Sequence, residues 1–566
     1  MQVHAAESRR PDRPEASRAP WAAGSWAPWR SLSGLGLIIG ALFLAASLTP
    51  SLIPRSFLLQ GVLAGVCFSI GYGLGVLLGA LWTYLELPVA GERARRIGTW
   101  IAAAAATIVV IVFVWHAAEQ QNSIRIRMGM PLVDSARPLE VGLIAALVFA
   151  VLIPAARLIH LVFRRIKRRV NRYVPVRLSR VVAIAVSVLL VVTILNGVIY
   201  KGFIRSADYS FKTLDALIVP DIAQPTDAMR TGSAASLIGW TDLGRTGREF
   251  VSSGPSREDI EAFLGRPALQ PIRVYAGLNS ADDAEARARL ALDELIRVGA
   301  FDRSVLVVAV PTGTGWMDPQ ATDTLEYLHG GDTAIVAVQY SYLTSPLSLF
   351  VEPGFSTATG RALFRTVYAY WTTLPKDRRP KLYLHGLSLG AFSSEQSFRL
   401  HDVLADPFQG AVWSGPPFAT PGWQSATRER DPGSPEWLPR FGDSSIIRFT
   451  NQHNALDIPG AHWGPMRLVY LQYASDPITF FSPDSLYRRP DWMNAPVGPD
   501  VSTELRWYPV VTFLQLILDM AIGLHVPMGY GHLFAPAHYI DAWIEVTAPQ
   551  GWDPNSVERL KAHFAE

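Results

Sequence analysis

Ser388 lies in a pattern that is typical of an activated serine. It is the centre of a G-x-S-x-G run, residues 386–390, which follows the apolar run Leu382–His385 and precedes Ala391–Leu400, a stretch that can continue as a helix. A serine on a tight turn from strand to helix holds a strained backbone, and the two glycines leave room for that turn. The hydroxyl is then exposed, and the N–H of Leu389 can stabilise an oxyanion. We therefore predict Ser388 as a nucleophile.

A serine nucleophile needs a base and an acid that orients the base, and after a turn of this kind they follow in the order serine, acid, histidine. Asp476 directly follows an apolar strand candidate, and the proline after it fixes a tight loop. Asp457 is the alternative acid. His532 lies in the glycine-flanked run Gly529–His532, ahead of a predicted helix. We predict Asp476 as the acid and His532 as the base.

A second oxyanion donor is expected from the loop after an earlier strand. The run Pro-Thr-Gly-Thr-Gly-Trp, residues 311–316, has two glycines that let the backbone approach a substrate oxygen, so we assign this role to Gly313 and Thr314. No lysine follows at the spacing of a phosphate-binding loop. His385, Trp316 and Trp413 are candidates to line the substrate site, although a core position is the simpler interpretation of His385.

Short apolar runs position these residues. The strand candidates are Ile272–Ala276, Val305–Val310, Ala334–Tyr340, Leu382–His385, Ala411–Trp413, Ile446–Thr450 and Leu468–Tyr473. Helical patterns lie between them, at Asp282–Val298 and Gly360–Thr372, and a last one follows at Pro536–Val546. Apolar strands separated by helices predict a mostly parallel sheet covered on both faces. In such sheets the functional residues lie in loops at the carboxyl ends of the strands.

A different composition precedes residue 205. Five long apolar stretches lie there, each close to or above the ~20 residues that a helix needs to cross a bilayer. They are Leu32–Ile53, Phe57–Leu85, Gly98–His116, Leu139–Phe163 and Val181–Tyr200. The whole chain of 566 residues is 49% hydrophobic and 17% charged, whereas a soluble protein has about 25% charged residues. These stretches predict five membrane-spanning helices.

Charge is divided unequally along the chain. Residues 1–205 carry 23 Lys and Arg against eight Asp and Glu, and the remainder carries 28 against 40. Before residue 205 the basic residues gather in the leader and in the loops after the second and fourth stretches, which the positive-inside rule places in the cytoplasm. The N-terminus is then cytoplasmic, and everything after the fifth span is extracytoplasmic. The acidic C-terminal part excludes a nucleic-acid-binding protein.

Two long insertions and one apolar run complete the C-terminal part. Pro416–Phe441 and Phe480–Trp507 are irregular and contain Trp423, Trp437 and Trp492. Such insertions can cover an active site and hold an acyl chain, or their aromatic residues can simply pack the insertions down. Trp507–Leu524 is apolar, but a sixth span there would separate His532 from Ser388 by the membrane. We interpret it as a core or membrane-resting helix.

The chain resembles α/β-hydrolase family 9, whose bacterial, membrane-bound members join a multi-span N-terminal domain to a hydrolase domain. The resemblance extends over about residues 30–545. It rests on the runs 311–316, 339–342, 385–390, 475–477 and 531–532. It implies Ser388, Asp476 and His532 as nucleophile, acid and base, at positions where this sequence shows no departure from the family.

The expected protein is an N-terminal all-α transmembrane bundle of five spans followed by an α/β-hydrolase domain with a mostly parallel sheet. The predicted boundaries are 1–30 for a basic cytoplasmic leader, 31–203 for the transmembrane domain, 204–265 for a linker into the next domain, and 266–566 for the catalytic domain. The single cysteine excludes a disulfide scaffold and a multi-cysteine metal site.

The predicted activity is that of a serine-dependent carboxylic ester hydrolase, esterase- or lipase-like, which needs no metal or organic cofactor. Its position beside the bilayer of the cytoplasmic membrane points to a lipid or lipophilic ester as substrate. An acyltransferase with the same triad, acting on a lipid or cell-envelope acceptor, is the first alternative. A ligand-binding membrane receptor or transporter without catalysis is the second, although no span has the ionisable pair that coupled transport commonly needs.

Overall fold

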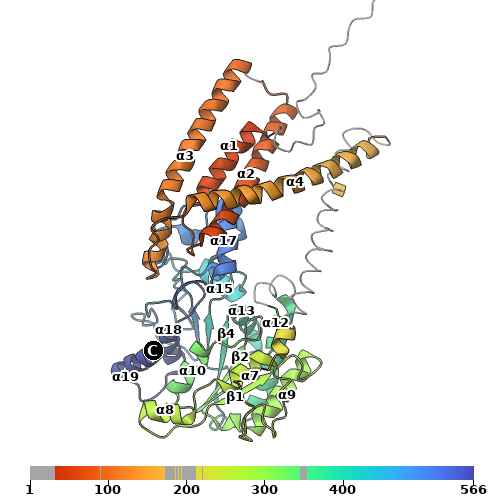
Figure 1. Cartoon of the computed structure of the whole chain (residues 1–566). Coiled ribbons are helices and arrows are strands. Elements are labelled where there is room, and N and C mark those ends of the chain that lie inside the picture. The colour runs from red at the N-terminus through yellow and green to blue at the C-terminus, as the bar shows by residue number, and fades with distance from the viewer. Residues whose placement is uncertain are drawn as a thin grey trace, which may run out of the picture.

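The computed structural model describes residues 32–88, 91–172, 212–218, 221–343 and 353–565, together with the single positions 185, 186, 189, 193 and 348. The described N-terminal helices stand at one end of an α/β domain (Figure 1). Helix α17 (Val511–Ile522), which comes from the C-terminal part of the sequence, lies where the two parts meet.

The α/β domain is built on seven parallel strands in the order β1-β3-β2-β4-β5-β7-β6. The strands are β1 (Ile272–Ala276), β2 (Val305–Val310), β3 (Thr333–Val338), β4 (Lys381–Leu387), β5 (Gly410–Ser414), β6 (Ile447–Thr450) and β7 (Arg467–Leu471). Each corresponds to a predicted apolar run. Every residue of β1, β2 and β3 is buried, because helices cover both faces of the sheet.

Helices precede β1, connect most of the strands and follow β7, whereas β6 leads to β7 without a helix. They are α7 (Gly244–Ser252), α8 (Arg257–Leu264), α9 (Ala284–Arg297), α10 (Pro319–Leu328), α12 (Pro353–Trp371), α13 (Leu389–Glu395), α14 (Leu400–Val403), α15 (Pro421–Arg428), α16 (Pro477–Phe480), α17, α18 (Pro536–Thr547) and α19 (Pro554–His563). Three short 3-10 helices lie at Ala300–Asp302, Pro483–Leu486 and Asp491–Met493. Helices α9 and α12 pack together, as do α10 and α18.

The stretch predicted as a linker, 204–265, contains α7 and α8. It is fastened to the α/β domain through Glu294 of α9, which is fully buried and accepts hydrogen bonds from Ser236 Oγ at 2.7 Å and from the N–H of Leu237 at 3.0 Å. Arg297 pairs with the same carboxylate. The part of this stretch that the structure describes therefore packs as part of the domain.

One predicted helix is shorter than expected. The run Ala391–Leu400 was expected to form one helix after the nucleophile, whereas α13 ends at Glu395 and α14 begins at Leu400. Ser397 lies between the two helices and donates its hydroxyl to the carbonyl of Ser394 at 2.7 Å. Serine side chains that bond to nearby backbone in this way compete with helix continuation.

The N-terminal helices are α1 (Gly34–Ser47), α2 (Phe57–Tyr84), α3 (Glu92–Arg127) and α4 (Pro138–Val170). Among the described residues, α2, α3 and α4 are long and apolar enough to cross a membrane. Helix α1 has 14 residues and is shorter than the span predicted at Leu32–Ile53. It ends ahead of Pro50, because proline cannot continue a helix and disfavours helical backbone in the residue before it. The predicted fifth span, Val181–Tyr200, lies outside the described residues apart from positions 185, 186, 189 and 193.

Glycines let α1 and α2 approach closely. A Cβ added at Gly75 of α2 would lie 2.7 Å from the Cα of Gly36 in α1, and one added at Gly40 would lie 2.9 Å from the carbonyl oxygen of Phe68. Small residues at a helix interface allow this backbone contact in a lipid environment, where close packing replaces the hydrophobic effect between helices.

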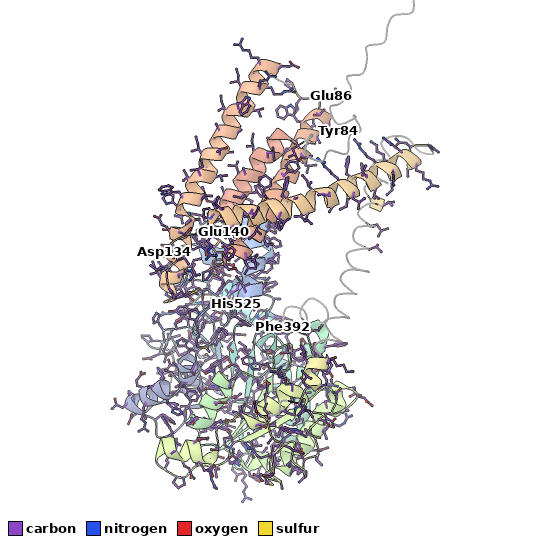
Figure 2. The ribbon with its side chains drawn as sticks, in the orientation of Figure 1. Tyr84, Glu86, Asp134, Glu140, Phe392 and His525 are labelled. Carbon is purple, nitrogen blue, oxygen red and sulfur yellow. The ribbon has the colours of Figure 1, made fainter. Side chains whose placement is uncertain are left out.

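The segment between α1 and α2, residues 48–56, joins the two parts of the molecule. Leu52 and Ile53 are fully buried in the same apolar cluster as the central strands. The carboxylate of Asp519 in α17 accepts hydrogen bonds from Ser51 Oγ and from the N–H of Leu52, both at 2.9 Å. Gln515 of α17 donates to the carbonyl of Thr49. Figure 2 shows the side chains of Asp134 and Glu140 at this junction and those of Tyr84 and Glu86 at the far end of the helices.

Candidate active site

Ser388 lies at the turn between β4 and α13. Its φ is 58° and its ψ is −125°, a backbone conformation that residues other than glycine rarely adopt. The glycines on either side are required by space. A Cβ at Gly386 would lie 2.4 Å from the backbone of Gly390, and a Cβ at Gly390 would lie 2.2 Å from the carbonyl oxygen of Val310. The N–H of Ser388 donates to the carbonyl of Ser414 at 2.9 Å, which ties the turn to β5. This is the geometry that the G-x-S-x-G pattern predicts.

Asp476 and His532 form a buried pair. His532 Nδ1 lies 2.7 Å from Asp476 Oδ2, and the aspartate is fully buried. The N–H of Ile478 donates to Asp476 Oδ1 at 2.8 Å, and Thr479 Oγ1 donates to Oδ2 at 3.2 Å. These bonds hold the carboxylate toward the imidazole. Asp457, the alternative acid, is exposed in the loop after β6, and the structure pairs His532 with Asp476.

The other imidazole nitrogen of His532, Nε2, is buried and has no hydrogen-bond partner among the described residues. His532 and Ser388 line the same cavity. An imidazole whose Nδ1 is bonded to a carboxylate, whose Nε2 has no partner, and which lines the same cavity as a serine, can accept a proton there.

A group of residues that the sequence analysis did not single out positions the histidine loop. Ser475 Oγ donates to Asp500 Oδ2 at 2.6 Å and accepts from the N–H of Gly531 at 2.9 Å, next to His532. A Cβ at Gly415, which has φ 50°, would lie 2.5 Å from His532 Cε1. The position of Gly415 directly after β5 was the one available signal, because loops at strand ends carry function in such sheets.

The cavity has a volume of about 610 Å³ and a largely apolar lining. Its lining residues are Thr312, Thr314, Trp316, Asp318, Gln320, Leu387, Ser388, Ile478, Met520, Ala521, Gly523, Leu524, Met528, His532, Leu533 and Phe534. Trp316, Leu524 and Met528 are 39%, 60% and 48% exposed, so large apolar side chains lie where the cavity meets its surroundings. Helix α17 and the loop after it supply the wall toward the N-terminal helices.

The predicted oxyanion loop is closed on itself. The N–H of Thr312 donates to the carbonyl of Trp316 at 3.0 Å, and the N–H of Gly315 donates to the carbonyl of Thr312 at 2.9 Å. Thr314 lines the cavity, whereas the buried Gly313 is not among the lining residues. Leu389 is the first residue of α13, where a backbone N–H has no partner within the helix.

Two of the three predicted lining residues lie in the core instead. Trp316 does line the cavity. His385 is 2% exposed, its Nδ1 lies 2.8 Å from the carbonyl oxygen of Val412, and burial lowers its pKa to about 4. Trp413 is 1% exposed and donates its Nε1 to Ser394 Oγ at 3.0 Å. Both side chains leave strands within the sheet and pack under helices, and the cavity lies beyond the strands' carboxyl ends.

The insertions after β5 and β7 pack down through their tryptophans. Trp423 donates its Nε1 to Gln472 Oε1 at 2.6 Å, and Trp437 donates to the carbonyl of Pro496 at 2.9 Å. Trp492 is 4% exposed. None of these three is among the residues described as lining the cavity of Ser388. Trp423 and Trp492 instead line a separate cavity of about 370 Å³ between the two insertions, and the hydrogen bonds of Trp423 and Trp437 hold the insertions down.

Asp318 is a buried carboxyl group in the cavity that the sequence did not single out. Its Oδ2 accepts from the hydroxyl of Tyr539 at 3.0 Å, and its Oδ1 accepts from the N–H of Gln320 at the start of α10. Burial raises the pKa of Asp318 to about 7, against the smaller opposing effects of these hydrogen bonds. The site therefore contains a second carboxyl group, which is neutral in acidic solution.

Comparison with known proteins gives two family matches and one structural similarity. The pattern of the alpha/beta-hydrolase family matches residues 272–560, and that of the alpha/beta-hydrolase family N-terminus matches residues 48–255. No curated protein matches the chain. A solved structure from work on LipS and LipT, two metagenome-derived lipolytic enzymes, is 12% identical, with 31% of this chain and 86% of that chain covered and a TM-score of 0.16.

Proposed function

Because this chain belongs to the alpha/beta-hydrolase family, we propose that it is a serine-dependent hydrolase that cleaves an acyl ester. The observation that carries the proposal is the His532 imidazole, which lies between the buried carboxylate of Asp476 and the cavity that Ser388 lines. The strained backbone of Ser388 supports it, because such strain is retained where the surrounding structure holds a residue for function.

In the proposed reaction, Ser388 Oγ attacks the acyl carbonyl carbon while His532 Nε2 takes the hydroxyl proton. Asp476 stabilises the imidazolium that forms, and the N–H of Leu389 with the loop 311–316 stabilises the oxyanion. The proton passes to the leaving alkoxide, which departs as the alcohol and leaves an acyl-enzyme. Water then attacks the acyl-enzyme, His532 takes its proton and returns it to Ser388 Oγ, and the carboxylic acid leaves.

The proposed substrate is a lipid or another lipophilic ester. The cavity wall is largely apolar, and exposed apolar side chains (Trp316, Leu524 and Met528) lie at its edge. Helix α17 forms part of that wall and also packs against α1 and α2, so the cavity lies on the side of the domain that faces the apolar helices. Faster hydrolysis of long-chain esters presented in micelles than of short soluble esters is expected, and the reverse preference would contradict this substrate class.

We also propose that the N-terminal helices span the cytoplasmic membrane with the hydrolase domain on the extracytoplasmic side. Three described helices are long and apolar enough to cross it. The loop after α1 and the end of α3 are expected outside because few basic residues lie there, and both contact the hydrolase domain. Ser51 bonds to Asp519, and Arg127 donates to the carbonyl of Pro499 at 3.0 Å. These two segments and the catalytic domain therefore lie on the same side of the N-terminal helices. This supports the orientation that the distribution of basic residues predicts.

The test of the function is covalent labelling of the detergent-solubilised full chain with a fluorophosphonate probe. Wild type should label, Ser388→Ala should not, and Asp476→Asn and His532→Ala should label at least about a hundredfold more slowly because they remove activation of the serine. Asp457→Asn is the matched control and should label like wild type. A folded wild type that fails to label, or Ser388→Ala that labels equally, would refute the proposal.

A further inference from the structure

A second cavity lies among the N-terminal helices, apart from the cavity of Ser388. Its volume is about 520 Å³, within the range of about 300–1,000 Å³ that ligand sites have. The lining residues are Leu44, Leu48, Arg55, Ser56, Phe57, Gln60, Val110, Val114, Ala117, Gln121, Arg125, Val133, Ser135, Ala136, Arg137, Pro138, Leu139, Val141 and Gly142. They come from the end of α1, the segment 48–56, α2, α3, the loop 128–137 and the start of α4.

The charge of this lining is entirely positive. Arg55, Arg125 and Arg137 line the cavity, and no aspartate or glutamate is among the described lining residues. Such a set of side chains favours a negatively charged group inside the cavity.

Arg55 is the buried member of the three, with 4% of its surface exposed. Its Nη2 donates to the carbonyl of Thr49 at 2.8 Å, and its backbone N–H donates to Gln121 Oε1 at 3.0 Å. The guanidinium Nε and Nη1 are buried and have no acceptor among the described residues. The side-chain amide nitrogen of Gln121, Nε2, is also buried and has no acceptor there. Several buried N–H groups at one place thus lack an acceptor, which is costly unless a ligand supplies one.

The nearby carboxylate of Asp519 does not fill this need. Its two oxygens accept from Ser51 Oγ and from the N–H of Leu52, each at 2.9 Å. The aspartate thereby fastens the segment 48–56 to α17, and the Arg55 donors Nε and Nη1 remain without an acceptor.

The remaining wall is largely apolar and extends away from Arg55 along α3. Val110, Val114, Ala117, Gln121 and Arg125 recur at steps of three or four residues and so share one face of the helix. That face changes from apolar to cationic over about 22 Å, at 1.5 Å per residue. The cavity is therefore amphipathic along its length, with its charged end at the junction with the hydrolase domain.

We propose that this cavity binds an anionic lipid, with its carboxylate or phosphate head on Arg55 and Gln121 and its acyl chain along the apolar face of α3. A charged acceptor would satisfy the free guanidinium donors with charge-assisted hydrogen bonds, and the chain would cover Val110 and Val114. The site uses no residue of the proposed catalytic machinery, and it stands whether or not the hydrolase proposal does.

The test measures lipid binding to the full chain, purified in an uncharged detergent, by titration with tritiated probes. The probes are oleate for a carboxylate head, oleoyl-lysophosphatidylglycerol for a phosphate head, and mono-oleoylglycerol as the uncharged counterpart. Wild type should bind at least one anion about tenfold or more tightly than the neutral probe, and the anion that binds better identifies the head group.

Two variants locate the site, each with a matched control. Arg55→Gln should weaken anion binding about tenfold or more, and exposed Arg96→Gln at the other end of α3 should not. Val114→Trp should fill the apolar half and abolish binding with Arg55 intact, whereas Val151→Trp on the exposed face of α4 should have no effect. If Arg55→Gln fails to fold, Val114→Trp decides. Binding that Val114→Trp leaves unchanged, or equal affinity of wild type for anionic and neutral probes, would overturn the proposal.

Discussion

The backbone of Ser388 is held in a conformation with φ 58° that costs about 1–3 kcal/mol for a residue with a side chain. Its neighbours determine that conformation: the N–H is bonded to β5, and Gly386 and Gly390 pack without room for a methyl group. This backbone conformation places Ser388 at the wall of the cavity. The lack of room for a methyl group at positions 386 and 390 explains why the pattern has glycine at both.

Gly390→Ala is expected to destabilise the protein by at least about 1–3 kcal/mol and to abolish fluorophosphonate labelling. The new Cβ would lie 2.2 Å from the carbonyl oxygen of Val310, which is backbone within the sheet and cannot move aside. Thermal unfolding of the solubilised protein measures the first effect. Gly354→Ala in α12, where a Cβ has open space, is the control. An alanine variant at 390 that is as stable and as reactive as wild type would contradict this account of the turn.

Asp318 is expected to make stability depend on pH. Its folded pKa is about 7, and an aspartate in an unfolded chain has a pKa near 3.9. Between those values the folded state holds a proton that the unfolded state has released, so this contribution to stability is full below about pH 4 and is lost as the pH rises through about 7. Asp318→Asn removes the titration; its amide oxygen can still accept from the N–H of Gln320, whereas its amide N–H would donate to the hydroxyl of Tyr539 instead of accepting from it.

The measurement is the melting temperature of wild type and Asp318→Asn from pH 4 to pH 8. The wild-type value minus the variant value should decrease as the pH rises. Parallel curves would show that Asp318 does not titrate differently in the folded state.

At the scale of elements, α17 serves both parts of the molecule. One face packs with Val511 against Ala46, Leu63 and Cys67 of the N-terminal helices, and the opposite side supplies Met520 to the cavity of Ser388. This short apolar helix therefore connects the two parts of the molecule. Because it packs against apolar residues on two sides, its own apolar residues are not limited to one face.

Asp519→Ala should weaken that contact. The change leaves Ser51 Oγ and the N–H of Leu52 without their acceptor, at a cost of about 1–3 kcal/mol for each buried group. We expect a lower melting temperature and slower labelling of Ser388, because α17 forms a wall of its cavity. Asp293→Ala, at an exposed position of α9, is the control and should behave as wild type. Unchanged stability in Asp519→Ala would show that the bonds do not hold the two parts together.

The elements of the sheet were predictable because burial on both faces favours runs of apolar residues; the buried Arg273 of β1 is an exception that ion pairs with Asp323 and Glu326 compensate. Val305–Val310 and Ile272–Ala276 were predicted with their observed bounds for that reason. Helix ends were less predictable, since they depend on single interactions. Helix α1 ends before Pro50, well short of the predicted span, and a serine-to-backbone bond helps to end α13 early. His385 and Trp413 were candidates to line the cavity, with a core position the simpler interpretation of His385, and both pack in the core.

At the scale of the whole molecule, the proposed topology predicts which introduced cysteines an impermeant maleimide reaches in intact cells. The native Cys67 is fully buried, so the wild type gives little background. Asp293→Cys, exposed on the hydrolase domain, should be labelled from outside, and Ser8→Cys in the basic leader should be labelled only after the membrane is permeabilised. Labelling of Ser8→Cys but not Asp293→Cys in intact cells would reverse the topology.

The sequence by itself determined the glycine-flanked turn at Ser388, the strands and three long apolar helices, because each of these leaves a pattern within a few residues of the chain. Tertiary structure alone decided that Ser51 meets Asp519, that Ser475 and Asp500 hold the loop of His532, and that Arg55 lies in a cavity whose described lining residues include no carboxylate. These contacts join residues that lie far apart in the chain or have no regular spacing. Their formation depends on how helices and sheet pack, which no local pattern of residues encodes.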